Sequence, residues 1–189
     1  GTAAPKLNKA SLKQLVGFFE SHSKWWRLQA QKELVCRKDL KAQEPLTQLL
    51  ENSKNQKAIV SALWTWNGLK LPYHPCLLNS FKNPDARVVA QALRATEFLS
   101  DVPPLFNAWE HLMLREEIEI HQQLALSLGN SPHPRAMDLL INLANADERD
   151  AYFCELLASS VHLKEGRVLP FLNQVSLREL ILNWQERAF

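Results

Sequence analysis

Glycine, cysteine and long apolar runs are scarce in this chain of 189 residues. Five glycines are too few for a sheet-rich fold, which needs many tight turns. The cysteines Cys36, Cys76 and Cys154 are isolated and odd in number, which excludes a full disulfide framework but leaves one bridge possible. We interpret them as small buried apolar side chains. No apolar run is long enough to cross a bilayer and no signal peptide is visible, so we expect no membrane segment.

Sequence motifs of enzymes are also missing. The chain has no Gly-x-Ser-x-Gly, no His-Glu-x-x-His and no phosphate-binding loop. Glu117 and His121 are four residues apart, as on one face of a helix, but a zinc site needs three or four converging ligands. We therefore interpret them as a solvated pair. We expect no catalytic residue, no metal and no cofactor in this chain.

Charge is unevenly distributed along the chain, although the net charge is only +2. Residues 1–70 contain 12 Lys and Arg against 5 Asp and Glu, a balance of +7, and residues 71–189 contain 10 against 15, a balance of −5. One interpretation is two solvated surfaces of opposite charge. The other is a basic N-terminal surface that meets an acidic partner, a phosphate group or a neighbouring domain.

The prolines and the polar residues next to them predict many short helices. Most of the ten prolines lie between apolar runs, where proline fits the first turn of a helix and not its interior. Ser11 is a candidate N-cap, and Asn83-Pro84-Asp85 combines a cap, a proline and an acid at a helix start. We expect Gly68 and Gly129 to end helices, with a left-handed backbone at Gly129. No segment alternates strictly enough to predict a strand.

Five segments can be aligned at a spacing of 30 to 34 residues. In each, a position that holds arginine in two of the copies precedes a small or apolar residue and an apolar helix face. The aligned residues are Arg27, Lys57, Arg87, His121 and Cys154. A repeat of this length is typical of stacked helix pairs, because one pair cannot bury its apolar face alone. The sequence therefore predicts an all-α fold, an α-solenoid of HEAT-like or armadillo type with about six helix pairs.

We expect this solenoid to form a single domain over residues 1–189. The first residues, which lack an initiator methionine, suggest a fragment of a longer protein with a tag remnant or linker at 1–6. Residues 176–189 depart from the repeat and are predicted to form a terminal capping helix.

Arginine and tryptophan supply the candidate binding residues. A repeated arginine can donate to an acid or carbonyl of the next repeat, and we expect Arg27 and Arg87, with Asp85, to form such a ladder. Adjacent residues lie about 100° apart on a helix, so one tryptophan of each close pair is expected at a groove edge or an interface. The residues predicted to bind a partner are Trp26, Arg27, Trp64, Trp66, Arg87 and Arg94.

A resemblance to a known family covers residues 7–174. The segments that carry it begin at Trp26-Arg27-Leu28-Gln29-Ala30-Gln31 and continue with Ala62-Leu63-Trp64-Thr65-Trp66-Asn67-Gly68-Leu69, Asn83-Pro84-Asp85-Ala86-Arg87-Val88, Gln123-Leu124-Ala125-Leu126-Ser127-Leu128-Gly129 and Ala158-Ser159-Ser160. This succession resembles the HEAT-like region of the membrane-bound dehydrogenase-type proteins of planctomycetes and their relatives. The resemblance implies a helical spacer between a β-propeller and a haem-binding cytochrome domain, in the periplasm or cell envelope. The chain has no Cys-x-x-Cys-His motif, so any redox activity would belong to other domains.

These observations favour a non-enzymatic scaffold or protein-interaction spacer, whose partner is a neighbouring domain or another protein. The alternative is a helical-repeat DNA-binding enzyme similar to the alkylpurine DNA glycosylases, which hold a damaged base in a basic groove lined by Trp and a catalytic Asp. The basic N-terminal part and its tryptophans fit this alternative, but the acidic remainder argues against nucleic acid. Salt-sensitive binding to duplex DNA distinguishes the two hypotheses.

Overall fold

The computed structural model describes residues 7–145, 156, 157, 159 and 160, and these contain helices and no strand. The α-helices are α1 (Leu12–Gly17), α2 (Lys24–Arg37), α3 (Gln43–Asn52), α4 (Gln56–Leu69), α5 (Leu77–Phe81), α6 (Ala86–Ala95), α7 (Pro103–Leu112), α8 (Ile118–Asn130) and α9 (Ala136–Asn145). Short 3-10 helices are η1 (Leu7–Lys9), η2 (Phe18–Glu20), η3 (Leu40–Ala42) and η4 (Glu97–Leu99). The prediction of an all-α fold is confirmed for the described residues. The predicted linker at 1–6 and capping helix at 176–189 lie outside them.

Contacts divide the chain into two compact units, residues 1–99 and 100–189. The prediction of a single domain over the whole chain stays a prediction. None of the described helices is both long enough and apolar enough to span a bilayer.

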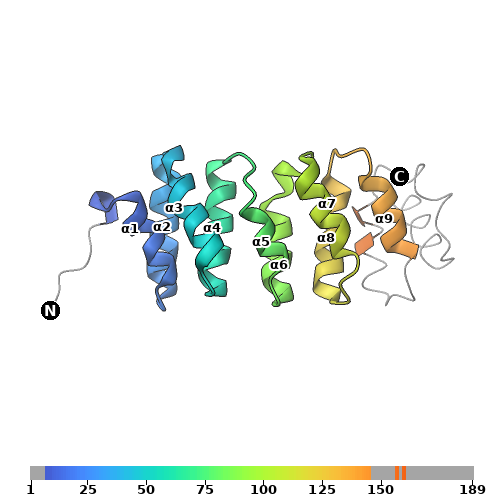
Figure 1. Ribbon diagram of the computed structural model, residues 1–189, viewed down its shortest axis with the longest axis horizontal. Helices are drawn as coiled ribbons and strands as arrows, with labels where there is room; N and C mark the ends of the chain where they lie inside the picture. Colours follow the sequence, from blue (N-terminus) through green and yellow to red (C-terminus); the bar gives the residue numbers. More distant parts are fainter. Residues whose placement is uncertain (1–6, 146–155, 158, 161–189) are drawn as a thin grey trace, which may run out of the picture. The chain divides into compact units, whose positions relative to one another are not determined.

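In the first unit the helices form pairs, and the pairs pack against one another. Helix α1 packs on α2, α3 on α4, and α5 on α6. Between pairs, α2 contacts α4 and α4 contacts α6, while α1 contacts α3 and α3 contacts α5. Figure 1 shows these helices in the blue to green part of the chain. The largest side chains buried here are Trp66, Phe19, Leu15, Leu34, Leu46, Leu63, Leu71, Leu77 and Leu93.

Polar side chains cap the starts of α1, α4 and α6. The Ser11 hydroxyl and the Gln14 side chain form a reciprocal capping box at α1, which confirms the predicted cap. Asn55 and Asp85 accept backbone N–H bonds at the starts of α4 and α6. The N-cap residues of α2, α4, α6 and α8 are Ser23, Asn55, Asp85 and Glu117. Their successive intervals of 32, 30 and 32 residues match the predicted spacing.

Counting from these N-caps corrects the alignment of the repeats. Arg27 and His121 lie four positions after their caps, whereas Lys57 and Arg87 lie only two positions after theirs. The fourth position is buried in every one of these helices and holds Arg27, Ile59, Val89 and His121. The second position is exposed in each and holds Trp25, Lys57, Arg87 and Glu119. The predicted column of arginine-like residues therefore mixes a core position with a surface position, and Cys154 lies outside the described residues.

Helices α4 and α8 end one residue after Gly68 and Gly129, within one residue of the predicted helix ends. Neither glycine has a positive φ. The left-handed residues are instead Lys38 and Lys70, with φ of 52° and 50°, immediately after α2 and α4. The predicted left-handed backbone at Gly129 is wrong. Both glycines instead permit close packing, because a Cβ would lie 2.8 Å from Val35 Cγ2 at Gly68 and 2.5 Å from the Ser160 carbonyl oxygen at Gly129.

The second unit packs α7 against α8 and α8 against α9. Phe106 and Trp109 of α7 are fully buried, as are Ile120, Leu124 and Leu128 of α8. A surface cluster joins α7 to the turn before α9. There the Arg135 guanidinium bonds the Glu110 carboxylate at 3.0 Å, and the His133 ring stacks on Phe106 with centroids 3.6 Å apart.

Candidate functional site

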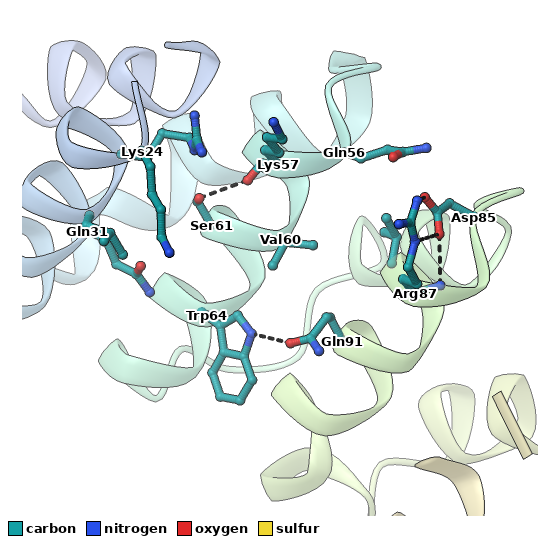
Figure 2. A pocket seen from close by; sticks show the side chains of 13 residues that line it. Lys24, Gln31, Gln56, Lys57, Val60, Ser61, Trp64, Asp85, Arg87 and Gln91 are labelled. Atoms are coloured by element: carbon teal, nitrogen blue, oxygen red, sulfur yellow. Dashed lines mark hydrogen bonds and ion pairs between the residues drawn. The ribbon is translucent and has the colours of Figure 1, made fainter. Parts of the chain in front are cut away.

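An open groove of about 460 Å³ lies in the first unit, across the three helices α2, α4 and α6. The residues that line it are Lys24, Arg27, Leu28, Gln31, Gln56, Lys57, Val60, Ser61, Trp64, Asp85, Arg87, Val88 and Gln91. Figure 2 shows α4 in the middle, with side chains of α2 on one side and of α6 on the other. The groove therefore draws on equivalent helices of three consecutive pairs.

The N-terminal ends of all three helices meet at this groove. Lys24 is the first residue of α2, Gln56 is the first of α4, and Asp85 is the N-cap of α6. The first N–H groups of a helix have no carbonyl partner within it, and they give its N-terminus a partial positive charge. The backbone therefore adds positive potential on the side where the lysine side chains lie.

The side chains of the groove are predominantly cationic. Lys24, Arg27, Lys57 and Arg87 line it, against the single carboxylate of Asp85 among its lining residues. Within the described part of the chain, the ion pairs include no partner for Lys24, Arg27 or Lys57. The groove consequently has an excess of positive charge that this part of the chain does not neutralise.

Arg27 is a buried cation with carbonyl partners. Its side chain is 9% exposed, and its Nη1 donates to the Ser21 carbonyl at 2.6 Å and to the His22 carbonyl at 3.1 Å. These carbonyls lie in the turn just before α2, in the same helix pair, so the predicted contact from Arg27 to the next repeat is wrong. The reason is its place on the helix: a residue four positions after the cap points back over the turn that leads into α2.

Asp85 is the N-cap of α6, and its carboxylate bonds Arg87. Its Oδ1 accepts from the Arg87 backbone N–H at 2.9 Å and from the Arg87 Nε at 3.0 Å, and its Oδ2 accepts from Nη2 at 2.8 Å. The bonds from the Arg87 side chain are the largest cause that holds the pKa of Asp85 below its usual range. Arg87 and Asp85 do pair as expected, but these bonds lie within one helix pair and do not link two pairs.

Trp64 is held at the groove by its neighbours on α6. Its indole Nε1 donates to the Gln91 Oε1 at 2.8 Å, and the two side chains point toward each other in Figure 2. The Arg94 guanidinium lies over the indole ring at 6.0 Å from its centroid. Because both partners come from α6, the ring of this α4 residue is fixed before any ligand arrives.

Four of the six predicted binding residues line the groove or contact it, and Trp26 and Trp66 do not. Arg27, Trp64 and Arg87 line the groove, and Arg94 contacts it through Trp64. Trp26 is not among the lining residues, and it stacks on Phe18 with ring centroids 5.3 Å apart.

The surface position expected for Trp66 is wrong. Its side chain is 1% exposed, and its indole N–H donates to the Pro72 carbonyl at 3.2 Å. On α2, by contrast, the apolar residues Trp25 and Leu28 are 57% and 49% exposed. In α2 the buried face consists of Arg27, Ala30 and Leu34. Arg27 takes the position that an apolar residue holds in α4 and α6.

Sequence reasoning missed the glutamines of the groove and the lysine at its edge. Gln31, Gln56 and Gln91 come from three different helices and have no common spacing, so no motif marks them. Lys24 carries a recognisable signal only once Ser23 is identified as the N-cap of α2. Asn67 was also missed, although its Nδ2 donates to the Ala95 carbonyl at 2.8 Å and joins α4 to the end of α6.

The interpretation of Glu117 and His121 as a solvated pair is wrong. His121 is buried, at 5% exposure, and the Glu117 carboxylate pairs with Arg115. Nowhere in the described part of the chain do three or more His, Cys, Asp or Glu side chains gather as metal ligands. Cys36 and Cys76 are free thiols, and Cys154 lies outside the described residues.

No known protein family and no curated protein matches this chain.

Proposed function

We propose that this chain is a non-enzymatic helical-repeat scaffold that binds a segment of a protein partner in the groove across α2, α4 and α6. The observation that carries the proposal is that three consecutive helix pairs contribute to one open groove with a fixed aromatic ring and several amide side chains. Concave surfaces of this kind, shared between repeats, are how helical-repeat proteins bind extended partners.

A HEAT-type solenoid is the architecture that this proposal assumes. It is supported by the regular spacing of the N-caps Ser23, Asn55, Asp85 and Glu117, and by the way α2, α4 and α6 pack in order. In the larger protein that the resemblance implies, the scaffold would hold a propeller and a haem-binding domain at a fixed separation in the periplasm or cell envelope. The open reading frame tests this setting, since a propeller upstream and a haem motif downstream support it.

A protein segment suits the groove better than nucleic acid. A duplex carries a phosphate about every 1.7 Å of its axis, and DNA-binding proteins commonly neutralise about six to ten of them. The groove offers Lys24, Arg27, Lys57 and Arg87, and Arg87 is already bonded to Asp85. Asp85 itself caps α6 and pairs with Arg87, which leaves it poorly placed to act on a damaged base.

Selection of phage-displayed random short peptides on the chain tests the proposal. Ser61 lies on α4 at the lining of the groove, so Ser61→Trp fills this space with an uncharged ring. Asn79→Trp, at an exposed position of α5 that does not line the groove, is the matched control. We expect peptides that bind the wild type and the control but not Ser61→Trp. The proposal would be overturned if the selected peptides bound Ser61→Trp as well as they bind the wild type, while the wild type and both variants had the same melting temperature.

Duplex DNA serves as the second ligand in the same experiment. Salt-sensitive binding of a short duplex that Ser61→Trp abolishes, with no groove-dependent peptide, would replace the scaffold by the DNA-binding alternative.

A further inference from the structure

We infer that the segment bound in this groove is acidic and extended, with carboxylates at the end where α2, α4 and α6 begin and an apolar side chain against Trp64. This inference rests on the proposed function and specifies the chemistry of the partner. It follows from the charges at the end where the helices begin, the apolar side chains further along them, and the amide side chains in the same lining.

The end of the groove where the helices begin is cationic, and it is complementary to an acidic ligand. Lys24 and Lys57 are exposed and line the groove from the adjacent helices α2 and α4, and the buried Arg27 of α2 belongs to the same lining. Arg27 uses one nitrogen, Nη1, for its two carbonyl bonds. A guanidinium offers five N–H donors, so donors remain for a ligand carboxylate. The helix N-termini at Lys24 and Gln56 add to the attraction for a negative group.

Carboxylates satisfy this end better than neutral groups. Hydrogen bonds between a cationic donor and a carboxylate are roughly twice as strong as neutral ones. Partial burial of Arg27 reduces the screening that weakens exposed ion pairs. The excess of positive charge over residues 1–70 acts in the same direction and increases the rate of encounter with an acidic segment.

The rest of the groove suits an apolar side chain flanked by peptide groups. Leu28, Val60 and Val88 supply apolar surface from three helices, and Trp64 supplies an aromatic ring. The ring is already held by Gln91, so a ligand does not have to order it. Gln31 and Gln56 carry amide groups that have no side-chain hydrogen bond to another described residue, and such amides can bond the peptide groups of an extended chain.

The composition of the peptides selected on wild-type protein tests the inference. We expect an excess of Asp and Glu, with at least one large apolar residue, among those that Ser61→Trp rejects. The charge-reversed double variant Lys24→Glu/Lys57→Glu should lose these peptides by about tenfold or more in affinity and enrich neutral or basic ones. The matched control Lys13→Glu/Lys41→Glu changes the net charge equally at exposed residues outside the groove. It should retain the acidic peptides, with at most a weak general effect of charge.

The outcomes separate the two proposals. Groove-dependent peptides that are neutral or basic, or acidic peptides that both double variants weaken alike, overturn the inference and leave the scaffold proposal standing. The absence of any groove-dependent peptide overturns both. Replacement of every Asp by Asn and every Glu by Gln in a selected peptide completes the test, since equal affinity of the two forms would also contradict a carboxylate site.

Discussion

The indole N–H of Trp64 donates to the side-chain oxygen of Gln91 at 2.8 Å, which joins α4 to α6 at the lining of the groove. We expect Gln91→Leu to lower the free energy of unfolding by about 0.5–1.5 kcal/mol, because the indole loses its acceptor while the apolar volume is kept. Urea unfolding measures this loss. Gln91→Glu keeps an acceptor at this position and should lose less. Equal loss in the two variants would mean that the bond contributes little and that packing explains the effect.

Gly129 and Gly17 should respond in opposite ways to the same change. A Cβ at Gly129 would lie 2.5 Å from the backbone oxygen of Ser160, so Gly129→Ala should lower the free energy of unfolding by about 1–3 kcal/mol. A Cβ at Gly17 would meet nothing within 4 Å, and its backbone is helical, with φ of −58° and ψ of −30°. Gly17→Ala should therefore stabilise the protein by about 0.5–1 kcal/mol. Thermal melting of both variants checks the pair, and a stabilised Gly129→Ala would contradict the close approach.

The acid dependence of stability should include a contribution from Glu117. Hydrogen bonds from the Arg115 guanidinium are the largest cause that lowers the pKa of Glu117 from 4.5 to about 2. Because the folded-state pKa is depressed, the stabilisation is present above about pH 4.5 and is lost as the pH falls toward 2.

Carbon-detected NMR titration of the Glu117 carboxyl tests this directly. Arg115→Met should return the pKa of Glu117 toward its usual range, whereas Glu116→Gln, at an exposed neighbour, should leave it low. A pKa of Glu117 that is the same in the wild type and in Arg115→Met would contradict the ion pair.

The two free thiols in the described part of the chain should differ in reactivity. Burial raises the pKa of the Cys76 thiol to about 11, and its Sγ lies 3.8 Å from the Thr47 hydroxyl, whereas Cys36 is exposed. At mildly alkaline pH, iodoacetamide should modify Cys36 at least about tenfold faster than Cys76, because the thiolate is the reactive form. Peptide mapping by mass spectrometry separates the sites, including Cys154. Similar rates at Cys36 and Cys76 in folded protein would contradict the burial of Cys76.

Helix positions could largely be predicted from the sequence because their signals are local. The cap at Ser11, the apolar face of α3 around Leu46, Leu49 and Leu50, and the start at Asp85 depend on residues within one or two turns. The period of about 32 residues followed from the same signals. These features confirm the all-α prediction for the described residues.

The register of the repeats could not be predicted from charge. Arg27 and Arg87 are the same residue type at the predicted spacing, but Arg27 occupies a core position and Arg87 occupies a surface position. A buried arginine satisfied by the Ser21 and His22 carbonyls has no sequence signature that distinguishes it from an exposed one. The position relative to the N-cap decides the outcome.

The groove depended on contacts between helices and was therefore predicted only in part. Trp64 was identified as a candidate, but its partner Gln91 is 27 residues away on another helix. Trp66, two residues further along α4, turns into the core by the pitch of the helix, and composition alone could not separate the two tryptophans.

The most direct measurement of the central claim is the NMR shift of the tryptophan indole N–H groups when a selected acidic peptide is added. Trp64 lines the groove, while Trp66 and Trp109 are buried and serve as internal references. We predict a saturable shift of the Trp64 indole, with the indoles of Trp66 and Trp109 unchanged, and Lys24→Glu/Lys57→Glu should raise the peptide concentration at half-saturation by about tenfold or more. Saturable binding that leaves Trp64 unshifted would contradict the account.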